Sequence, residues 1–384
     1  MPPSPTRSPD WQWRWWLPVP LYPYSQRRTL RCEVIADWVW MFEQIQGVLY
    51  VVTPIRMTVL RLETGGLMVY APIAPTPECL RLLQELVDRY GAVQHIILST
   101  TSGIEHKVFV GPFARACSSA TVYVAPGQWS FPLNLPLSWL GLPARRTQLL
   151  TSQHPWGDRF DLAILDSIEL GLGKFGEVAV FDRRFQLLLV TDTVVSIPTT
   201  PPEIVQLDPY PLLFHARESA SDPVVDSPTQ RLTGWQRIVL FTFYFRPSMV
   251  KIDKTLAMLQ AAQKSPDKST RAFWGLYPFH WQPHWQKSFD QTCDQSRLMV
   301  APILQQLILN RQTPKTRTWV EQVAQWDFQQ VISCHFQAPV TATSTDWRRA
   351  FEFLDDQSHL PEADLALLRD IDGLLSRSGV LPLK

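Results

Sequence analysis

The stretch Ala92-Val93-Gln94-His95-Ile96-Ile97-Leu98-Ser99-Thr100-Thr101-Ser102-Gly103-Ile104-Glu105-His106 decides the fold. Residues 92–98 are mainly apolar and predict a short buried strand, while residues 107–117 predict a helix that Gly111-Pro112 interrupts. Polar residues between a strand and a helix lie at the carboxyl edge of a sheet, where open α/β folds place their chemistry. Glu105-His106 is therefore either a metal or acid–base pair, or the polar start of a helix.

The pattern on both sides of this stretch predicts two series of strands with helices between them. Residues 75–90 give the clearest helix, because leucines recur at helical spacing and Gly91 ends the pattern. The predicted strands are 48–53, 57–62, 67–70, 92–98, 121–124, 148–151, 160–168, 177–181, 187–191 and 330–334. The other predicted helices are 298–310, 319–328, 347–354 and 362–377, and the apolar run 238–245 is either a buried helix or a strand.

Composition excludes several classes of protein. The chain has 384 residues, of which 45% are apolar and 18% charged, so it can bury a sizeable core. Its net charge of +1 gives no electrostatic argument for a nucleic-acid partner. The five cysteines are odd in number and form no CxxC pair, which favours a reducing compartment. We expect no signal peptide and no transmembrane helix, because the longest apolar run is far shorter than a membrane span of roughly 20 residues.

The predicted organisation has four parts. Residues 1–35 form an extended arm rich in tryptophan and proline, which either packs on the domain or makes peripheral contact with a membrane surface. Residues 36–202 and 321–358 form the core, and residues 203–320 form an insertion. A C-terminal helix and tail follow at 359–384.

Several phrases resemble one protein family. The order of strands and polar strand ends looks like the metallo-β-lactamase superfamily, and more closely like its branch known as DUF4336. The phrases that carry this resemblance lie between residues 47 and 355 and are Arg56-Met57-Thr58-Val59, Glu105-His106-Lys107, Pro126-Gly127-Gln128-Trp129-Ser130-Phe131-Pro132, Leu189-Val190-Thr191-Asp192 and Cys334-His335-Phe336. The resemblance implies an α+β protein with a metallo-β-lactamase-like αββα four-layer sandwich and a large, mostly helical insertion. It also implies a cytoplasmic location, in a cyanobacterial-type cytosol or a plastid stroma.

The superfamily's first motif, Thr-His-x-His-x-Asp-His, aligns with residues 100–106. Thr101 and Gly103 take the first two histidine positions, and the superfamily's middle histidine falls near Gly173, so three ligands of one metal are absent. The four ligand positions of the other metal are filled, by Glu105, His106, Asp192 and His335. The resemblance therefore implies a site for one divalent metal: zinc, iron or manganese.

The resemblance implies a degenerate metallohydrolase that activates water on an ester, thioester or amide. Its catalytic residues are Glu105, His106 and Asp192, with His335 as a further metal ligand. Substrate contacts are predicted for Gln128, Trp129, His154 and Lys107. The partner is an unknown small-molecule substrate or a protein, and no nucleic acid is expected.

The alternative is a non-catalytic binding or assembly protein that retains the fold. Glu105 also suits the first turn of a helix, where the dipole favours a carboxylate. Asp192 also suits a turn cap, and His335 a partly buried structural position. Redox chemistry, which the superfamily also includes, is disfavoured by the loss of one metal's ligands.

Overall fold

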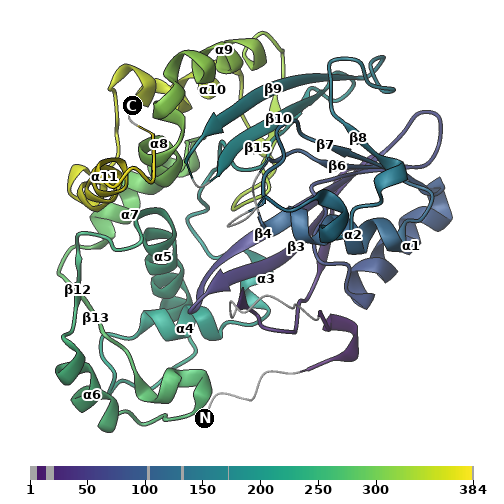
Figure 1. Cartoon of the computed structure of the whole chain (residues 1–384). Coiled ribbons are helices and arrows are strands. Elements are labelled where there is room, and N and C mark those ends of the chain that lie inside the picture. Colours follow the sequence, from purple (N-terminus) through teal and green to yellow (C-terminus); the bar gives the residue numbers. More distant parts are fainter. Residues whose placement is uncertain (1–6, 14–20, 102–103, 131–133, 172, 383–384) are drawn as a thin grey trace.

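Two β-sheets face each other in the computed structural model, which describes residues 7–13, 21–101, 104–130, 134–171 and 173–382 (Figure 1). The larger sheet has the order β1-β3-β4-β5-β6-β7-β8, and β2 also pairs with β3. Its strands are β1 (Leu21–Tyr22), β2 (Leu30–Ile35), β3 (Val39–Val48), β4 (Val51–Arg61), β5 (Leu67–Tyr70), β6 (Val93–Leu98), β7 (Thr121–Val124) and β8 (Thr147–Leu149). Strands β1 to β5 are antiparallel, whereas β5 to β8 run parallel to one another.

The smaller sheet has the order β15-β14-β11-β10-β9. Its strands are β9 (Phe160–Glu169), β10 (Lys174–Asp182), β11 (Leu187–Leu189), β14 (Gln330–Ile332) and β15 (Val340–Thr341). Only β11 and β14 are parallel, and their register pairs Leu189 with Ile332. This register places the two chain segments that leave these strands side by side.

Four layers follow from the alternation of side chains along the strands. One face of the larger sheet packs on α1 (Pro77–Tyr90) and α2 (Ile104–Ala116), and one face of the smaller sheet packs on α9 (Thr313–Val323) and α10 (Ser344–Ala350). The other faces meet in a shared core, which includes Tyr70 and Ile97 from the larger sheet and Val178 and Ile332 from the smaller one. The predicted αββα sandwich is confirmed.

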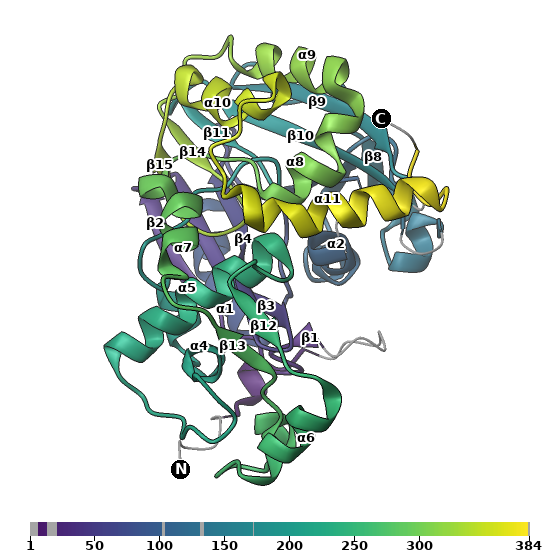
Figure 2. The ribbon, with the colours of Figure 1, turned by 90° about the vertical axis from the view of Figure 1, so that its left-hand side faces the viewer.

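Residues 203–320 add a mostly helical region beside the sandwich (Figure 2). It contains α3 (Glu203–Gln206), α4 (Tyr210–Ala216), α5 (Pro228–Tyr244), α6 (Thr255–Gln263), α7 (Gln286–Cys293), α8 (Pro302–Leu307) and the ribbon β12 (Val250–Ile252) with β13 (Phe279–Trp281). Its core is continuous with Ile45 and Val52 of the larger sheet and with α11 (Glu362–Arg377). The proposed boundary at residue 320 falls inside α9. Among the described residues, no helix is long and apolar enough to cross a bilayer.

The structure refines or corrects three sequence predictions of local structure. Residues 30–35, which were assigned to the arm, form β2 paired with β3 and so belong to the larger sheet. Residues 39–48 were not predicted as a strand, although they form β3, and β4 continues through Pro54 where two strands were expected. The apolar run 238–245 belongs mainly to α5, whose buried residues lie on several sides of the helix because it packs between neighbours. The helix 362–377 and the strand 121–124 are confirmed.

His215 on α4 gives the fold a measurable sensitivity to acid. The side chain is buried among the rings of Phe214, Phe241 and Phe279. Burial, reinforced by nearby arginines, lowers the pKa of His215 from 6.5 to about 3. Between these two values the unfolded chain binds a proton that the folded chain does not, so stability falls as the pH falls through this window.

We therefore expect acidification from about pH 7.5 to about pH 5 to remove about 2 kcal/mol of stability through His215 alone. Urea unfolding at both pH values measures this loss, and the His215→Phe variant is the control because it keeps an aromatic ring without a titratable group. An equal loss of stability in the two proteins would contradict the prediction.

Candidate metal centre

Asp192 and His335 are neighbours because of strand register. Leu189 of β11 pairs with Ile332 of β14, and Asp192 and His335 each lie three residues beyond these paired positions. The two loops are joined by a hydrogen bond from the Cys334 N–H to the Thr191 carbonyl. A parallel pair of strands thus delivers a carboxylate and an imidazole to the same edge of the smaller sheet.

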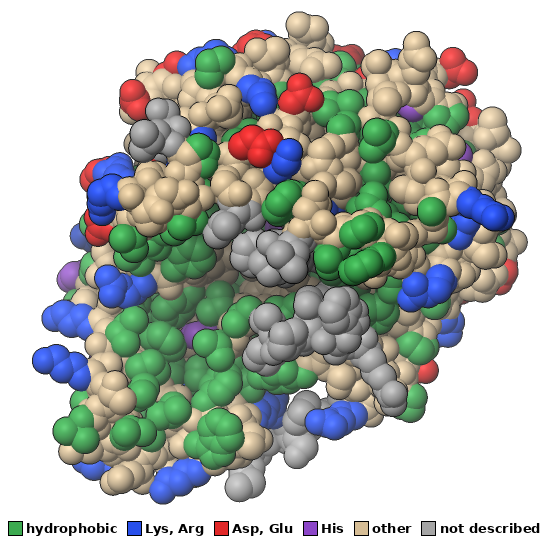
Figure 3. Space-filling model, in the orientation of Figure 1, with side chains coloured by type: hydrophobic (Ala, Val, Ile, Leu, Met, Phe, Trp, Pro, Cys, Tyr) green, Lys and Arg blue, Asp and Glu red, His purple; other side chains and the backbone are tan. Residues whose placement is uncertain are grey.

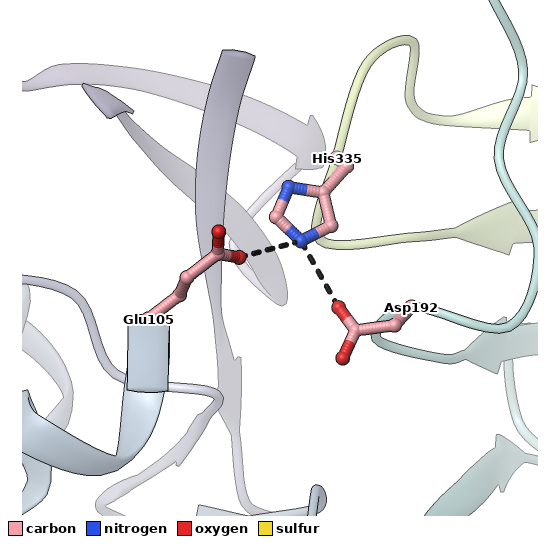
Figure 4. Close-up of side chains that lie close together, drawn as sticks. All are labelled: Glu105, Asp192 and His335. Atoms are coloured by element: carbon pink, nitrogen blue, oxygen red, sulfur yellow. Dashed lines mark hydrogen bonds and ion pairs between the residues drawn. The ribbon is translucent and has the colours of Figure 1, made fainter. Parts of the chain in front are cut away.

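Glu105 reaches the same point from the larger sheet (Figure 4). It lies in the first turn of α2, and its Oε2 is 3.1 Å from His335 Nε2. Asp192 Oδ1 lies 3.0 Å from the same nitrogen, and His335 Nδ1 lies 3.0 Å from the Pro54 carbonyl. Ligand atoms of all three side chains lie within 4.8 Å of one another. The side chains of Glu105, Asp192 and His335 are 36%, 21% and 13% exposed, so solvent reaches the group mainly beside Glu105.

His106 follows Glu105 and lies near the group, but it is not one of the three residues whose ligand atoms converge. Its Nδ1 lies 3.1 Å from the Pro72 carbonyl, which fixes the proton on that nitrogen and leaves the lone pair on Nε2. Nε2 is buried and has no hydrogen-bond partner among the described residues. The rings of His106 and His335 are 6.3 Å apart between centroids. A buried imidazole nitrogen without a partner, beside two carboxylates and a second imidazole, fits a divalent metal ion.

The charges of the group are strongly coupled. Burial opposes the protonation of His335, yet the carboxylates of Glu105 and Asp192 raise its pKa well above the usual value. Burial opposes the ionisation of Glu105, but His335, His106 and Arg27 hold its pKa below the usual value. The pKa of His106 is lowered, chiefly by burial. In this arrangement the Glu105 carboxylate is therefore anionic and His106 neutral, as metal ligands must be, whereas His335 is protonated and would have to release that proton to bind a metal ion.

Glu177 fixes the Asp192 loop, a role that the sequence analysis did not assign. This buried carboxylate on β10 accepts hydrogen bonds from the backbone N–H groups of Thr191, Asp192 and Thr193, at 2.7, 2.9 and 3.0 Å. Burial, together with the charge of Asp192, raises the pKa of Glu177 to about 7. The neighbouring residues of β10 bond to the end of β6, through Thr101 N–H to the Gly176 carbonyl and Val178 N–H to the Ser99 carbonyl. Glu177 thus lies where the two sheets meet. An acidic residue within the apolar part of a strand was the sequence feature that could have identified it.

Arg56 fixes the His335 loop in the same way. It lies fully buried on β4 and donates hydrogen bonds to the carbonyls of Ser333 and Phe336, which flank His335. Its Nε lies 2.9 Å from Glu43 on the adjacent strand β3. The sequence analysis quoted Arg56 only as part of a family phrase. As with Glu177, a charged residue inside an apolar strand was the sequence feature that could have identified it.

Other groups of the chain occupy the space around Thr101 and Gly173, the two described positions at which the superfamily has a histidine and this chain does not. The Thr101 carbonyl accepts hydrogen bonds from the Trp129 N–H and from Lys107 Nζ, and Lys107 also bonds to the Trp129 carbonyl. A Cβ atom on Gly173 would lie 3.4 Å from the Trp129 ring, so this ring borders the position of the missing middle histidine. Gly103 lies outside the described residues.

The residues predicted to contact substrate do not form one cluster in the structure. Gln128 Nε2 donates to the carbonyls of Thr100 and Ala125, at 2.7 and 3.0 Å, so it braces the end of β6. Lys107 is buried, and burial lowers its pKa to about 7. His154 packs on Trp156, whose ring also contacts His95 and Tyr123, so it belongs to a separate aromatic group. Phe131 and Pro132 of the proline-rich loop lie outside the described residues.

The fold and the carboxylate–histidine group define a metallo-β-lactamase-like αββα protein with one candidate metal centre. The chain belongs to the family described as Domain of unknown function (DUF4336), whose model matches residues 36–353.

Several solved structures are similar to the chain. One is a metal-soaked flavodiiron core from Synechocystis sp. PCC6803, with 11% identity and a TM-score of 0.44, over 86% of this chain and 62% of that one. A DIM-1 metallo-β-lactamase exposed to ceftazidime shares 9% identity with a TM-score of 0.39, over 85% of this chain and 97% of that one. The chain therefore spans less than two thirds of the flavodiiron core. No curated protein matches this sequence.

Proposed function

We propose that this protein is a degenerate metallohydrolase, in which one divalent ion acts on an ester, thioester or amide. The observation that carries the proposal is the convergence of Glu105, Asp192 and His335 from two sheets, beside the buried unpartnered Nε2 of His106. Two carboxylates and two imidazoles suit zinc, ferrous iron or manganese. A divalent ion held there would supply Lewis acidity and lower the pKa of a water molecule.

Each residue has a separate role in this proposal. Asp192 and His335 orient one another through their 3.0 Å contact, and Glu177 and Arg56 hold their loops in place. Glu105 directs Oε2 toward His335, while its Oε1 makes no hydrogen bond to a described residue. Because Glu105 is also the most exposed of the three, its Oε1 is the atom that we assign to accepting a proton during hydrolysis.

Substrate contact is part of the proposal for Gln128 and Trp129. Gln128 Oε1 and Trp129 Nε1 have no hydrogen-bond partner among the described residues, although both atoms are buried. Lys107 is engaged by carbonyl groups and His154 lies in the aromatic group around Trp156, so we assign these two side chains to positioning the surrounding loops.

A non-catalytic binding or assembly protein is the second candidate. The observation that favours it is that His335 already has a partner on each ring nitrogen, the Pro54 carbonyl on one side and two carboxylates on the other. In that case the group is a structural ion pair that ties the two sheets together, and the orphaned His106 nitrogen is tolerated without a ligand.

Metal analysis combined with hydrolytic screening separates the two candidates. We expect the purified protein, after dialysis against zinc, ferrous or manganese ions, to retain about one ion per chain. The loaded protein should hydrolyse members of a panel of chromogenic esters, thioesters and anilides, and a chelator should abolish this activity. A protein that retains no ion and hydrolyses nothing would support the assembly candidate instead.

A further inference from the structure

A segment at the far end of the insertion carries features that the candidate metal centre does not explain. The segment, which we call the tip, comprises residues 250–281 and contains the ribbon β12–β13, helix α6 and the 3₁₀ segment Thr270–Gly275. In Figure 1 it forms the lower left corner of the molecule, away from the helices α9 and α10. It therefore projects where a partner surface can reach it.

Helix α6 has an apolar outer face as well as an inner one. Its inner stripe consists of Met258, Ala261 and Ala262, which are wholly or partly buried. On the other side, Leu256 and Leu259 are 69% and 50% exposed. A surface helix normally carries charged or polar side chains at such positions. Two exposed leucines three residues apart therefore form an unpartnered apolar face.

The tip exposes further apolar side chains. Ile252, the last residue of β12, is 49% exposed, and Trp274, which borders a cavity shared with the N-terminal segment, is 63% exposed. Trp274 lies in the 3₁₀ segment, which packs against α6 where Gly275 approaches the Ala262 carbonyl. Figure 3 shows apolar side chains gathered over this corner of the molecule, with lysine and arginine side chains around them.

The charge of the tip is unusual for this chain. Four of its nine lysines, Lys251, Lys254, Lys264 and Lys268, lie within 18 residues, although the net charge of the whole chain is only +1. All four are exposed, and none forms an ion pair with a described residue.

Two acidic side chains, Asp253 and Asp267, lie among these lysines. Asp253 bonds to His280, at 2.8 Å, and Asp267 accepts the Ser269 N–H, and both keep their negative charge. The four lysines outnumber the two aspartates, so residues 251–268 carry a net charge of +2 beside an apolar patch.

We propose that the tip is a docking surface for an anionic lipid membrane. Leucine, isoleucine and tryptophan side chains enter the boundary between headgroups and acyl chains, while surrounding lysines bind lipid phosphates and carboxylates. Lysine also suits this place because its long stem keeps the ammonium group at the polar level. The lysines favour an anionic membrane over a neutral one because their charge is opposite to that of the lipids. The exposed apolar side chains favour a membrane over a soluble anion, which offers them no apolar contact.

The two described tryptophans of the N-terminal arm, Trp11 and Trp13, contact the sandwich and are not available for membrane contact. Trp11 donates a hydrogen bond from Nε1 to Glu78 on α1, at 3.1 Å, and Trp13 packs on Phe109 of α2. Both are held on the sandwich, and the membrane contact predicted for the arm stays a prediction. Trp15 and Trp16 lie outside the described residues.

Sedimentation with lipid vesicles tests the proposal on the full chain. We expect binding to vesicles of phosphatidylcholine with phosphatidylserine, weak binding to phosphatidylcholine alone, and loss of binding at high salt. The Lys251→Gln/Lys254→Gln variant should bind about 25-fold more weakly, at about fivefold for each lysine. The Leu256→Gln/Leu259→Gln variant should bind at least about tenfold more weakly.

Matched controls use side chains of similar exposure elsewhere. Leu149→Gln/Leu374→Gln removes two exposed leucines, and Arg115→Gln/Arg145→Gln removes two exposed charges, in each case outside the tip. Both controls should bind like the unmodified chain, with or without added divalent metal, so the result is independent of the proposed hydrolytic function.

Three results would overturn the proposal. The first is an absence of binding to anionic vesicles at low salt. The second is an equal loss of binding in the tip variants and their controls. The third is self-association that the Leu256→Gln/Leu259→Gln variant abolishes, without any vesicle binding, because it would make a second copy of the chain the occupant of the tip.

Discussion

Replacing Asp192 by asparagine is expected to weaken the binding of a divalent ion by at least about 100-fold, because even residues that only support a ligand contribute 10- to 100-fold. Asparagine keeps the shape of the side chain but removes a charge from the group of Glu105, Asp192 and His335. The backbone N–H of residue 192 still bonds to Glu177, so the loop keeps its position. The loss therefore reports on the carboxylate itself.

Competition with a fluorescent chelator measures this affinity for zinc, ferrous and manganese ions. Asp158→Asn is the matched control, because Asp158 is exposed and has no part in the group. If Asp192→Asn and Asp158→Asn bind the ion equally well, Asp192 is not a ligand. If neither they nor the unmodified chain bind an ion, while Asp192→Asn alone loses stability, the group is structural.

Replacing Arg56 by leucine is expected to lower the free energy of unfolding by about 3–5 kcal/mol, because it breaks a buried ion pair on one side only. Glu43 would lose its cation, and the carbonyls of Ser333 and Phe336 would lose a buried donor. These carbonyls flank His335, so the same change should weaken metal binding in the molecules that remain folded. Few single changes at the surface of a protein approach this size.

Urea unfolding in metal-free buffer measures the loss of stability, so that ligand binding does not contribute to it. Arg81→Leu on α1 is the control, since Arg81 is exposed and its ion pair within the described part of the chain is with Glu85; we expect it to change stability by less than about 0.5 kcal/mol. A loss below about 1 kcal/mol for Arg56→Leu would show that the loop is held by other contacts.

Helices and strands were predicted well where the residues that begin and end them are visible in the sequence, and poorly where they depend on a partner strand. The helix Pro77–Tyr90 begins at Thr76, whose side chain accepts the Cys79 N–H, and it ends at Gly91 with φ of 99°, so both signals lie in the sequence. Strand β2 was missed because its residues are only partly buried and gain their partner from β3. Strand β4 was predicted as two strands, 48–53 and 57–62, whereas it runs through Pro54, whose carbonyl accepts a hydrogen bond from His335 Nδ1.

Part of the candidate site could likewise be predicted from the sequence, and part of it depends on the tertiary structure. The sequence by itself placed Glu105, His106 and Asp192 at the polar ends of predicted strands, and the family resemblance added His335 to this set. Only the tertiary structure decided which of them meet, because the meeting depends on the parallel register of β11 and β14 and on the junction of the two sheets at Glu177. It also placed Lys107 among carbonyl groups and His154 in a separate aromatic group. The chemical character of each side chain can be read from the sequence. The distance between Asp192 and His335, which lie more than 140 positions apart, is fixed by the packing of the folded chain.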